Sequence, residues 1–257
     1  MSVLIWILGA TALGGALSAL IAALFLLVPE RRRSAWLPHL VSFATGALLG
    51  AALLKLLPQA IERAGLEQVH LIGFAAAGGI FAFFVLEKLV LWRHCHAEDC
   101  DSHGTHQQHR DKASGVMILA GDAIHNALDG VLIAAAFLTD IRLGIVTSVA
   151  VIAHEIPQEV GDFAILLNSG MSRRRAFAMN LATSLTSVVG GVVAYFALGN
   201  SLQLLPYALA IAAASFLYVA VADLIPGLHR RVEPVASLQQ VALIAVGLAV
   251  IVVSDLH

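Results

Sequence analysis

The sequence predicts an all-α integral membrane protein, and three observations lead to that fold class. Of its 257 residues, 59% are hydrophobic and only 12% are charged. Apolar stretches of about 20 residues recur along the chain, each long enough to cross a hydrocarbon core of about 30 Å as a helix. The alternating ten-residue pattern of barrel strands is absent from the sequence, and helices satisfy their own backbone groups in lipid.

The apolar stretches number eight, and we expect them to form one transmembrane domain over residues 1–257. They leave no room for a separate soluble domain. Small residues are frequent within them, which allows helix backbones to approach closely. The predicted helices cover residues 3–28, 37–58, 69–92, 114–138, 142–167, 175–198, 204–225 and 235–254.

The loops predict how the helices are oriented. The first span has no basic region or small-residue cleavage site before or after it, so we expect it to remain in the mature protein. Two loop residues on one side are basic, Arg63 and Arg142, against eleven on the other side. Since basic loops stay in the cytoplasm, both termini are predicted on the non-cytoplasmic side. The eleven are Arg31, Arg32, Arg33, Arg93, Arg110, Lys112, Arg173, Arg174, Arg175, Arg230 and Arg231.

Two prolines near the ends of the second and seventh spans hint at an internal repeat. Pro58 follows Leu-Leu, and Pro226 follows Leu-Ile. Many transporters are built from inverted repeats around a site at the middle of the membrane. Chance similarity between short apolar motifs is the alternative explanation.

The fourth span carries a polar face. At about 100° per residue, Asp122, His125, Asn126 and Asp129 fall within one arc of about 100°. A carboxylate at the bilayer centre costs about 2.5–3.5 kcal/mol on insertion scales, so such groups usually line a pathway or a binding site.

The fifth span carries a second polar face, which spans about 140°. The loop that joins these two spans is short, so the helices are expected to be antiparallel neighbours whose polar faces meet. Pro157 within the span removes one helical hydrogen bond and frees the carbonyl of Ala153 to line a cavity. The polar residues of this face are His154, Glu155, Gln158, Glu159 and Asp162.

Together the two faces predict a metal site. Mixed imidazole and carboxylate ligands suit Zn²⁺ best, with Fe²⁺, Mn²⁺ and Cd²⁺ as alternatives. Polar groups that merely join helices contribute about 0.6 kcal/mol per pair, and nine such side chains are too many for that role alone.

At these motifs the chain resembles the ZIP family of divalent metal transporters. The matching patterns are His125-Asn-x-x-Asp-Gly130 and His154-Glu-x-Pro-x-Glu-x-Gly-Asp162. The resemblance implies a 3+2+3 inverted-repeat bundle with a midplane site between helices 4 and 5. It also implies transport of a divalent metal, most readily Zn²⁺, into the cytoplasm, and a homodimer.

The same resemblance implies which residues bind metal. Asp129 and Gln158 would bridge two metal positions, one completed by His125 and His154, the other by Asn126 and Glu155; Glu159 is counted with them as a candidate ligand. Gln158 stands where relatives commonly have His or Glu. Ser187 stands where some relatives have Glu, which favours one tightly bound ion.

Two further features of the sequence bear on the route of the metal. In the second span, Lys55 stands where relatives often have a metal-binding residue; it would repel metal, replace a departed ion, or extend to the interface. Residues 94–109 hold five histidines and both cysteines. We expect this cytoplasmic loop, 94–112, to bind metal with its thiolates reduced; an ordinary polar linker is the alternative.

Two other functions remain open from the sequence. His154-Glu155-x-x-Gln158 is one residue away from the His-Glu-x-x-His motif of zinc proteases, so an intramembrane zinc metalloprotease is one alternative. A membrane metal sensor without transport is the other. We expect a transporter rather than an enzyme, located in a bacterial inner membrane, with no nucleic-acid partner.

Overall fold

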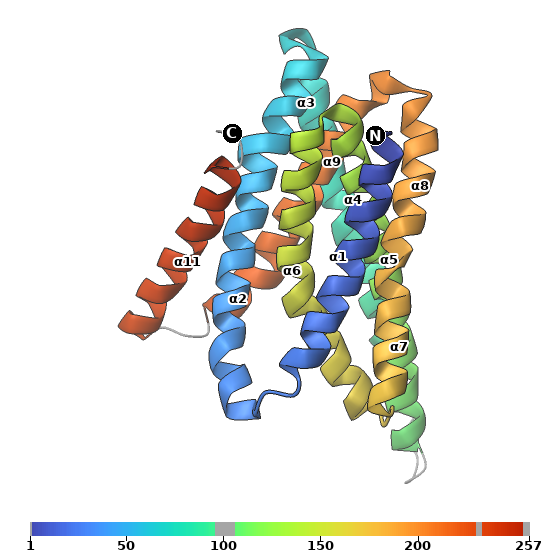
Figure 1. The fold of residues 1–257 in the computed structure, drawn as a ribbon, viewed down its shortest axis with the longest axis vertical. Coiled ribbons are helices and arrows are strands. Elements are labelled where there is room, and N and C mark those ends of the chain that lie inside the picture. The colour runs from blue at the N-terminus through green and yellow to red at the C-terminus, as the bar shows by residue number, and fades with distance from the viewer. Residues whose placement is uncertain (1, 96–105, 230–232, 254–257) are drawn as a thin grey trace.

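The computed structural model describes residues 2–95, 106–229 and 233–253, and this part of the chain is helical without a strand. The helices form one bundle, and the first and last described parts of the chain lie toward its upper end in Figure 1. The long helices are α1 (Val3–Phe25), α2 (Glu30–Ala51), α4 (Val69–Cys95), α5 (His106–Thr139), α6 (Ile141–Asn168), α7 (Arg173–Ser184), α8 (Thr186–Gly199), α9 (Leu205–Tyr218) and α11 (Pro234–Val253). The predicted all-α membrane fold is confirmed.

Within the described residues, seven helical segments are long and apolar enough to cross a membrane, so the predicted count of eight is not confirmed. The missing segment is α6, which has 28 residues and is therefore long enough. Its composition excludes it, because the polar face that carries His154 and Glu155 makes the helix less apolar. The predicted metal-binding face thus weakens the membrane signal of its own helix.

The second and seventh spans have the same break. A π-helical stretch, Ala52–Leu56, joins α2 to α3 (Leu57–Ala64), and another, Val219–Leu224, joins α9 to α10 (Ile225–Leu228). Pro58 and Pro226 follow these stretches. Because proline cannot donate to the preceding turn, a π turn is one way to change the hydrogen-bond register there. The matching breaks support an internal repeat.

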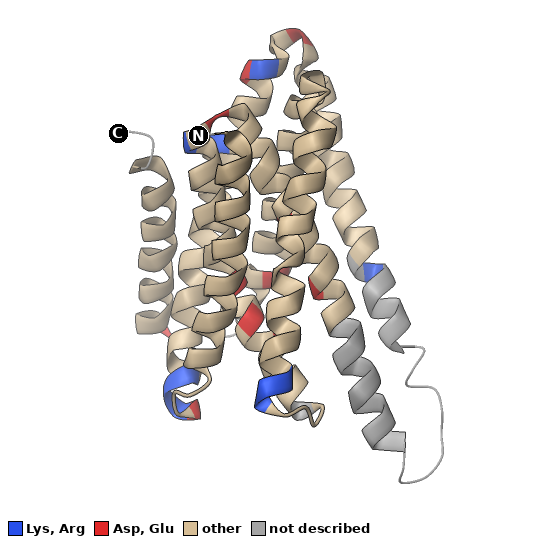
Figure 2. Cartoon of the chain, turned by 45° about the vertical axis from the view of Figure 1, so that its right-hand side comes forward, with Lys and Arg blue, Asp and Glu red and all other residues tan. Residues whose placement is uncertain are grey.

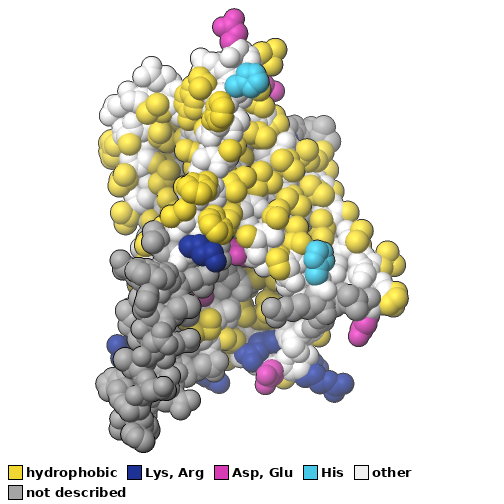
Figure 3. Space-filling model, turned by 180° about the vertical axis from the view of Figure 1, so that it is seen from behind, with side chains coloured by type: hydrophobic (Ala, Val, Ile, Leu, Met, Phe, Trp, Pro, Cys, Tyr) yellow, Lys and Arg dark blue, Asp and Glu magenta, His cyan; other side chains and the backbone are white. Residues whose placement is uncertain are grey.

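Side chains on the outside of the bundle suit a lipid environment. Large hydrophobic residues are exposed along α4 and α8, including Phe74 at 74% and Val189 at 62%, and hydrophobic side chains cover most of the described upper face in Figure 3. Lys and Arg gather at the turns between α1 and α2 and between α6 and α7 (Figure 2). This end of the bundle is called the Arg-rich end below.

Helix α5 is held between α6 and α8, which are among its main packing partners. Asp140 alone separates α5 from α6, and its carboxylate caps α6 by accepting the amide N–H groups of Arg142 and Leu143 at 2.8 and 3.2 Å. The expectation of antiparallel neighbours is therefore correct. On the other side, Gly130 and Gly190 let the backbones of α5 and α8 touch.

The predicted loop 94–112 differs from what is described. Helix α5 begins at His106, so residues 106–112 form its first turns and do not belong to a loop. The remainder of the predicted metal-binding tract falls mainly on residues 96–105, which lie outside the described residues.

Candidate metal centre

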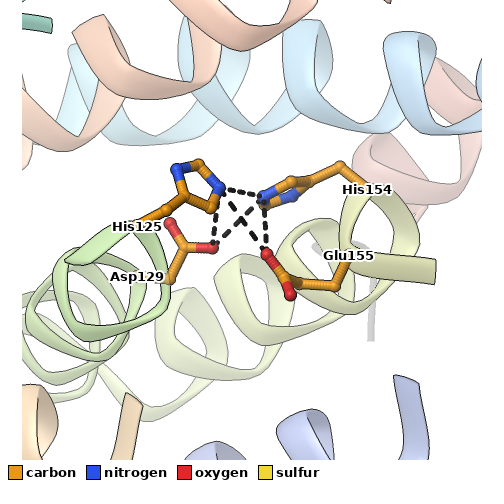
Figure 4. Close-up of side chains that lie close together, drawn as sticks. All are labelled: His125, Asp129, His154 and Glu155. Carbon is orange, nitrogen blue, oxygen red and sulfur yellow. Dashed lines mark hydrogen bonds and ion pairs between the residues drawn. The ribbon is translucent and has the colours of Figure 1, made fainter. Parts of the chain in front are cut away.

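Four side chains from two helices converge at one point. His125 and Asp129 are one turn apart on α5, while His154 and Glu155 are consecutive on α6 (Figure 4). One ligand atom from each residue lies within 4.8 Å of the other three. The polar faces predicted for the two helices therefore meet, as the short connection required.

The spacing of these atoms fits a tetrahedral metal ion. Zinc with ligands at about 2.0–2.2 Å separates neighbouring ligand atoms by about 3.3–3.6 Å. His154 Nε2 lies 3.2 Å from Asp129 Oδ2, 3.6 Å from Glu155 Oε1 and 3.4 Å from His125 Nε2. His125 Nε2 lies 3.8 Å from Asp129 Oδ2 and 3.6 Å from Glu155 Oε1. Only small adjustments would bring the four atoms to bonding distance of one ion.

The hydrogen bonding of His154 leaves a lone pair facing the cluster. Its Nδ1 lies 3.1 Å from the carbonyl oxygen of Ala150. Since a carbonyl can only accept, Nδ1 carries the proton, and Nε2 is left as a lone-pair donor to metal. The helix backbone thus orients this ligand.

The two carboxylates of the cluster have no hydrogen-bond donor. Asp129 and Glu155 are 1% and 2% exposed, and all four of their oxygens are buried without a hydrogen-bond partner. Buried carboxylate oxygens are costly unless a cation or a proton compensates them. Converging acceptors with two formal negative charges are a group that could hold a divalent cation.

Three other predicted ligands lie outside this group of four. Asn126 is buried and its amide donates to Asp122 Oδ1 at 2.8 Å, which leaves the amide oxygen as the atom it can offer to metal. Gln158 lines a cavity beside the cluster. Glu159, the third, has its own partners.

Glu159 faces α7 rather than the cluster. The carboxylate is fully buried and accepts hydrogen bonds from Asn180 and Ser184. On α6 it lies about 140° from His154, which turns it toward a different neighbour. Sequence reasoning missed both partners, although Asn180 and Ser184 are four residues apart and so share a face of α7.

Replacement of Glu159 by alanine is expected to destabilise the protein and leave its zinc affinity nearly unchanged. The substitution leaves the buried amide of Asn180 without its acceptor, at a cost of about 1–3 kcal/mol, while the Ser184 hydroxyl keeps its second acceptor, the carbonyl of Asn180. Thermal unfolding in detergent and equilibrium zinc binding test this, with Glu159→Gln as the variant that keeps the shape. A loss of zinc affinity of 100-fold or more with unchanged stability would instead make Glu159 a ligand.

A cavity of about 500 Å³ connects the cluster toward the Arg-rich end. His125 and Asp122 line it, together with residues from the halves of α2, α4 and α6 that lie nearest that end, the last residue of α9 and the π-helical stretch Val219–Leu224. Among the described residues that line it are three acidic side chains, Asp122, Asp162 and Asp223, and no Lys or Arg. A cation in this cavity would meet negative charge along its walls.

Toward the other end the cluster is closed by packed apolar side chains. Ala150 and Phe216 are fully buried, and the Phe216 ring lies 6.0 Å from the ring of His154. Beyond this packing a second cavity, of about 360 Å³, is lined by Lys55, Arg63 and Leu143 among others. Among the described residues, the four-residue cluster therefore borders a cavity toward the Arg-rich end and packed apolar side chains toward the other end.

Comparisons with known proteins agree with these features. A family model described as "ZIP Zinc transporter" matches residues 1–114 and 92–255. The "Zinc transporter ZIP13" of Pongo abelii is 35% identical over 238 residues, which cover 86% of this chain and 68% of that protein. The human "Zinc transporter ZIP13" is 32% identical over 86% of this chain and 72% of its own length. The human "Zinc transporter ZIP4" is 45% identical over 118 residues, 46% of this chain and 18% of that protein.

Proposed function

This chain belongs to the ZIP zinc transporter family, and from that premise we propose that it carries Zn²⁺ across a membrane through the cluster of His125, Asp129, His154 and Glu155. The family and its relatives are transporters rather than enzymes, so the protease alternative is not retained.

One observation carries the proposal for the site. Two imidazoles and two carboxylates from adjacent helices converge at distances near those between the ligands of a tetrahedral ion, and the carboxylate oxygens have no donor of their own. A structural role would require donors that compensate these oxygens. A divalent cation supplies that compensation.

We further propose how the ion reaches and leaves the cluster. The acidic cavity leads from the cluster to the Arg-rich end, which the positive-inside rule assigns to the cytoplasm. The ion then enters from the side of the termini when the apolar packing beyond His154 opens, and leaves through the acidic cavity. By the family resemblance, we propose that net movement is toward the cytoplasm, and we count α6 as the eighth span.

The bound ion is proposed to be single and to be zinc. Two carboxylates neutralise the charge of one divalent ion, and neutral imidazole is a borderline ligand that suits zinc. Asn126 and Gln158 offer only neutral amide oxygens for a second ion. Fe²⁺, Mn²⁺ and Cd²⁺ are the competitors to examine.

The oligomeric state of the transporter, its membrane and the role of its His/Cys tract are also proposals. A homodimer is carried over from the family resemblance. The relatives reported above come from animals and lend no support to a bacterial inner membrane, which stays a prediction. A metal-receiving role for the His/Cys tract also stays a prediction.

Uptake of ⁶⁵Zn²⁺ by proteoliposomes tests the transport function. We expect saturable accumulation above that of protein-free vesicles, and competition by unlabelled metals that ranks their affinities. Release of the accumulated label by an ionophore distinguishes transport from surface binding. Stoichiometric zinc binding without accumulation would favour the sensor alternative instead.

A further inference from the structure

Thr147 on α6 has an unusual hydroxyl group. The residue is fully buried, and among the described residues its Oγ1 is the only buried hydroxyl oxygen without a hydrogen-bond partner. Other buried helical hydroxyls donate to a carbonyl in the preceding turn; Thr11 bonds to Ile7 and Ser148 to Gly144. Because an unpaired buried hydroxyl is destabilising, Thr147 calls for an explanation.

The position of Thr147 on α6 provides one. At about 100° per residue, Thr147 lies about 20° from His154 and about 40° from Leu143, so the three share a face of the helix. Leu143 lines the cavity that contains Lys55, and His154 belongs to the metal centre. With a rise of about 1.5 Å per residue, Thr147 is about 10 Å from His154 and about 6 Å from Leu143 along the axis.

The same face continues past the metal centre. Gln158 lies about 40° from His154 on this helix and lines the acidic cavity at the Arg-rich end. One face of α6 therefore runs from the Lys55 cavity, past Thr147 and His154, into the acidic cavity. Between the Lys55 cavity and His154, Ala150 and Val151 are buried and apolar, so Thr147 supplies the unpaired oxygen in the closed section.

We propose that Thr147 Oγ1 is a transient ligand for the transported cation between the Lys55 cavity and the metal centre. This inference rests on the proposed transport function. Hydroxyl oxygen is a weak ligand for a divalent ion, which suits a position that the ion must leave quickly. When this section opens, the hydroxyl would replace one water of the partly dehydrated ion and so lower the barrier to passage.

A purely structural role predicts a different outcome for the same substitution. Valine matches threonine in shape and removes the hydroxyl, so Thr147→Val should be neutral or stabilising as long as that hydroxyl has no structural partner. Only the transport role predicts that such an intact or stabilised protein is slower. Thr147→Ser keeps the hydroxyl and should restore the rate.

The experiment compares wild type, Thr147→Val, Thr147→Ser and the control Thr11→Val in proteoliposomes. Thr11 is also buried in a helix, but its hydroxyl is bonded to Ile7 and it lines neither cavity. For Thr147→Val we expect a maximal rate of ⁶⁵Zn²⁺ uptake that is about five- to tenfold lower. Its equilibrium zinc binding and its melting temperature should be no lower than those of wild type. Thr147→Ser and Thr11→Val should transport at near wild-type rates.

The outcomes separate this inference from the proposed function. Wild-type uptake together with an undiminished rate for Thr147→Val would overturn the inference and leave transport intact. A lower rate accompanied by a lower melting temperature would also overturn it, because the hydroxyl would then have a structural partner. If wild-type protein itself accumulates no zinc, the proposed function fails first.

Discussion

Asp129→Asn is expected to lower zinc affinity by about 60- to 700-fold and to reduce ⁶⁵Zn²⁺ uptake to that of protein-free vesicles. Zinc sites in small domains provide about 10–16 kcal/mol of binding free energy, or about 2.5–4 kcal/mol for each of four ligands, and 1.4 kcal/mol corresponds to tenfold. Asp129 is central to the cluster, with Oδ2 3.2 Å from His154 and 3.8 Å from His125. The substitution keeps the shape and removes one of two compensating charges.

Controls make this prediction specific. Asp129→Asn should be at least as stable as wild type without metal, since it removes a buried charge that has no hydrogen-bond donor. Glu67→Gln removes an exposed carboxylate that lines neither cavity and should leave uptake unchanged. Uptake by Asp129→Asn at more than about a tenth of the wild-type rate would place the transported ion elsewhere.

Gly130→Ala is expected to destabilise the helix bundle by at least about 3 kcal/mol. A Cβ atom at this position would overlap the carbonyl oxygen of Ser187 and lie 2.8 Å from the amide nitrogen of Gly191. These are backbone atoms of α8, which cannot rotate away as a side chain can. The two helices would have to separate. Asp129, which directly precedes Gly130, would then move with α5.

Thermal unfolding in detergent and zinc binding measure this effect. Gly190→Ala should behave similarly, because its Cβ would overlap the carbonyl oxygen of Ala127 on α5. Gly78→Ala is the matched control: it too is helical, but no atom lies within 4 Å of its Cβ position. Alanine favours helix by about 1 kcal/mol over glycine, so Gly78→Ala should be neutral or stabilising. Equal stability of all three variants would contradict the close packing of α5 and α8.

Much of the site follows from the sequence because it depends on local geometry. His125 and Asp129 are one turn apart, and His154 and Glu155 lie on the polar face of the next helix. Because Asp140 is the only residue between these two helices, they must pack antiparallel. Helical periodicity and a short connection therefore suffice to predict that the two faces meet.

What the sequence did not reveal depends on contacts between distant segments. Glu159 belongs to the polar face of α6, yet its position at the edge of that face turns it toward Asn180 and Ser184 on α7. Periodicity gives the direction of a side chain relative to its own helix but does not identify the neighbouring helix. The unpaired hydroxyl of Thr147 and the two cavities are likewise products of packing, which no single segment encodes.

The membrane spans, too, could be predicted only in part from the local sequence. Composition identified the apolar helices, but α6 is less apolar than the others because it carries the polar face of His154 and Glu155. Its recognition as a span required the neighbouring helices and the motif together. The π-helical turns before Pro58 and Pro226 could not be predicted from the sequence either. The sequence contains the two prolines but does not indicate how the backbone hydrogen bonds shift around them.

X-ray absorption at the zinc edge tests the central claim most directly, since it reports the atoms around the bound ion. Protein loaded with one equivalent of zinc should show about four nitrogen and oxygen neighbours at about 2.0–2.2 Å, two of them imidazole, as expected for His125, Asp129, His154 and Glu155. A shell dominated by sulfur at about 2.3 Å would place the ion on the cysteines of the His/Cys tract and contradict the account.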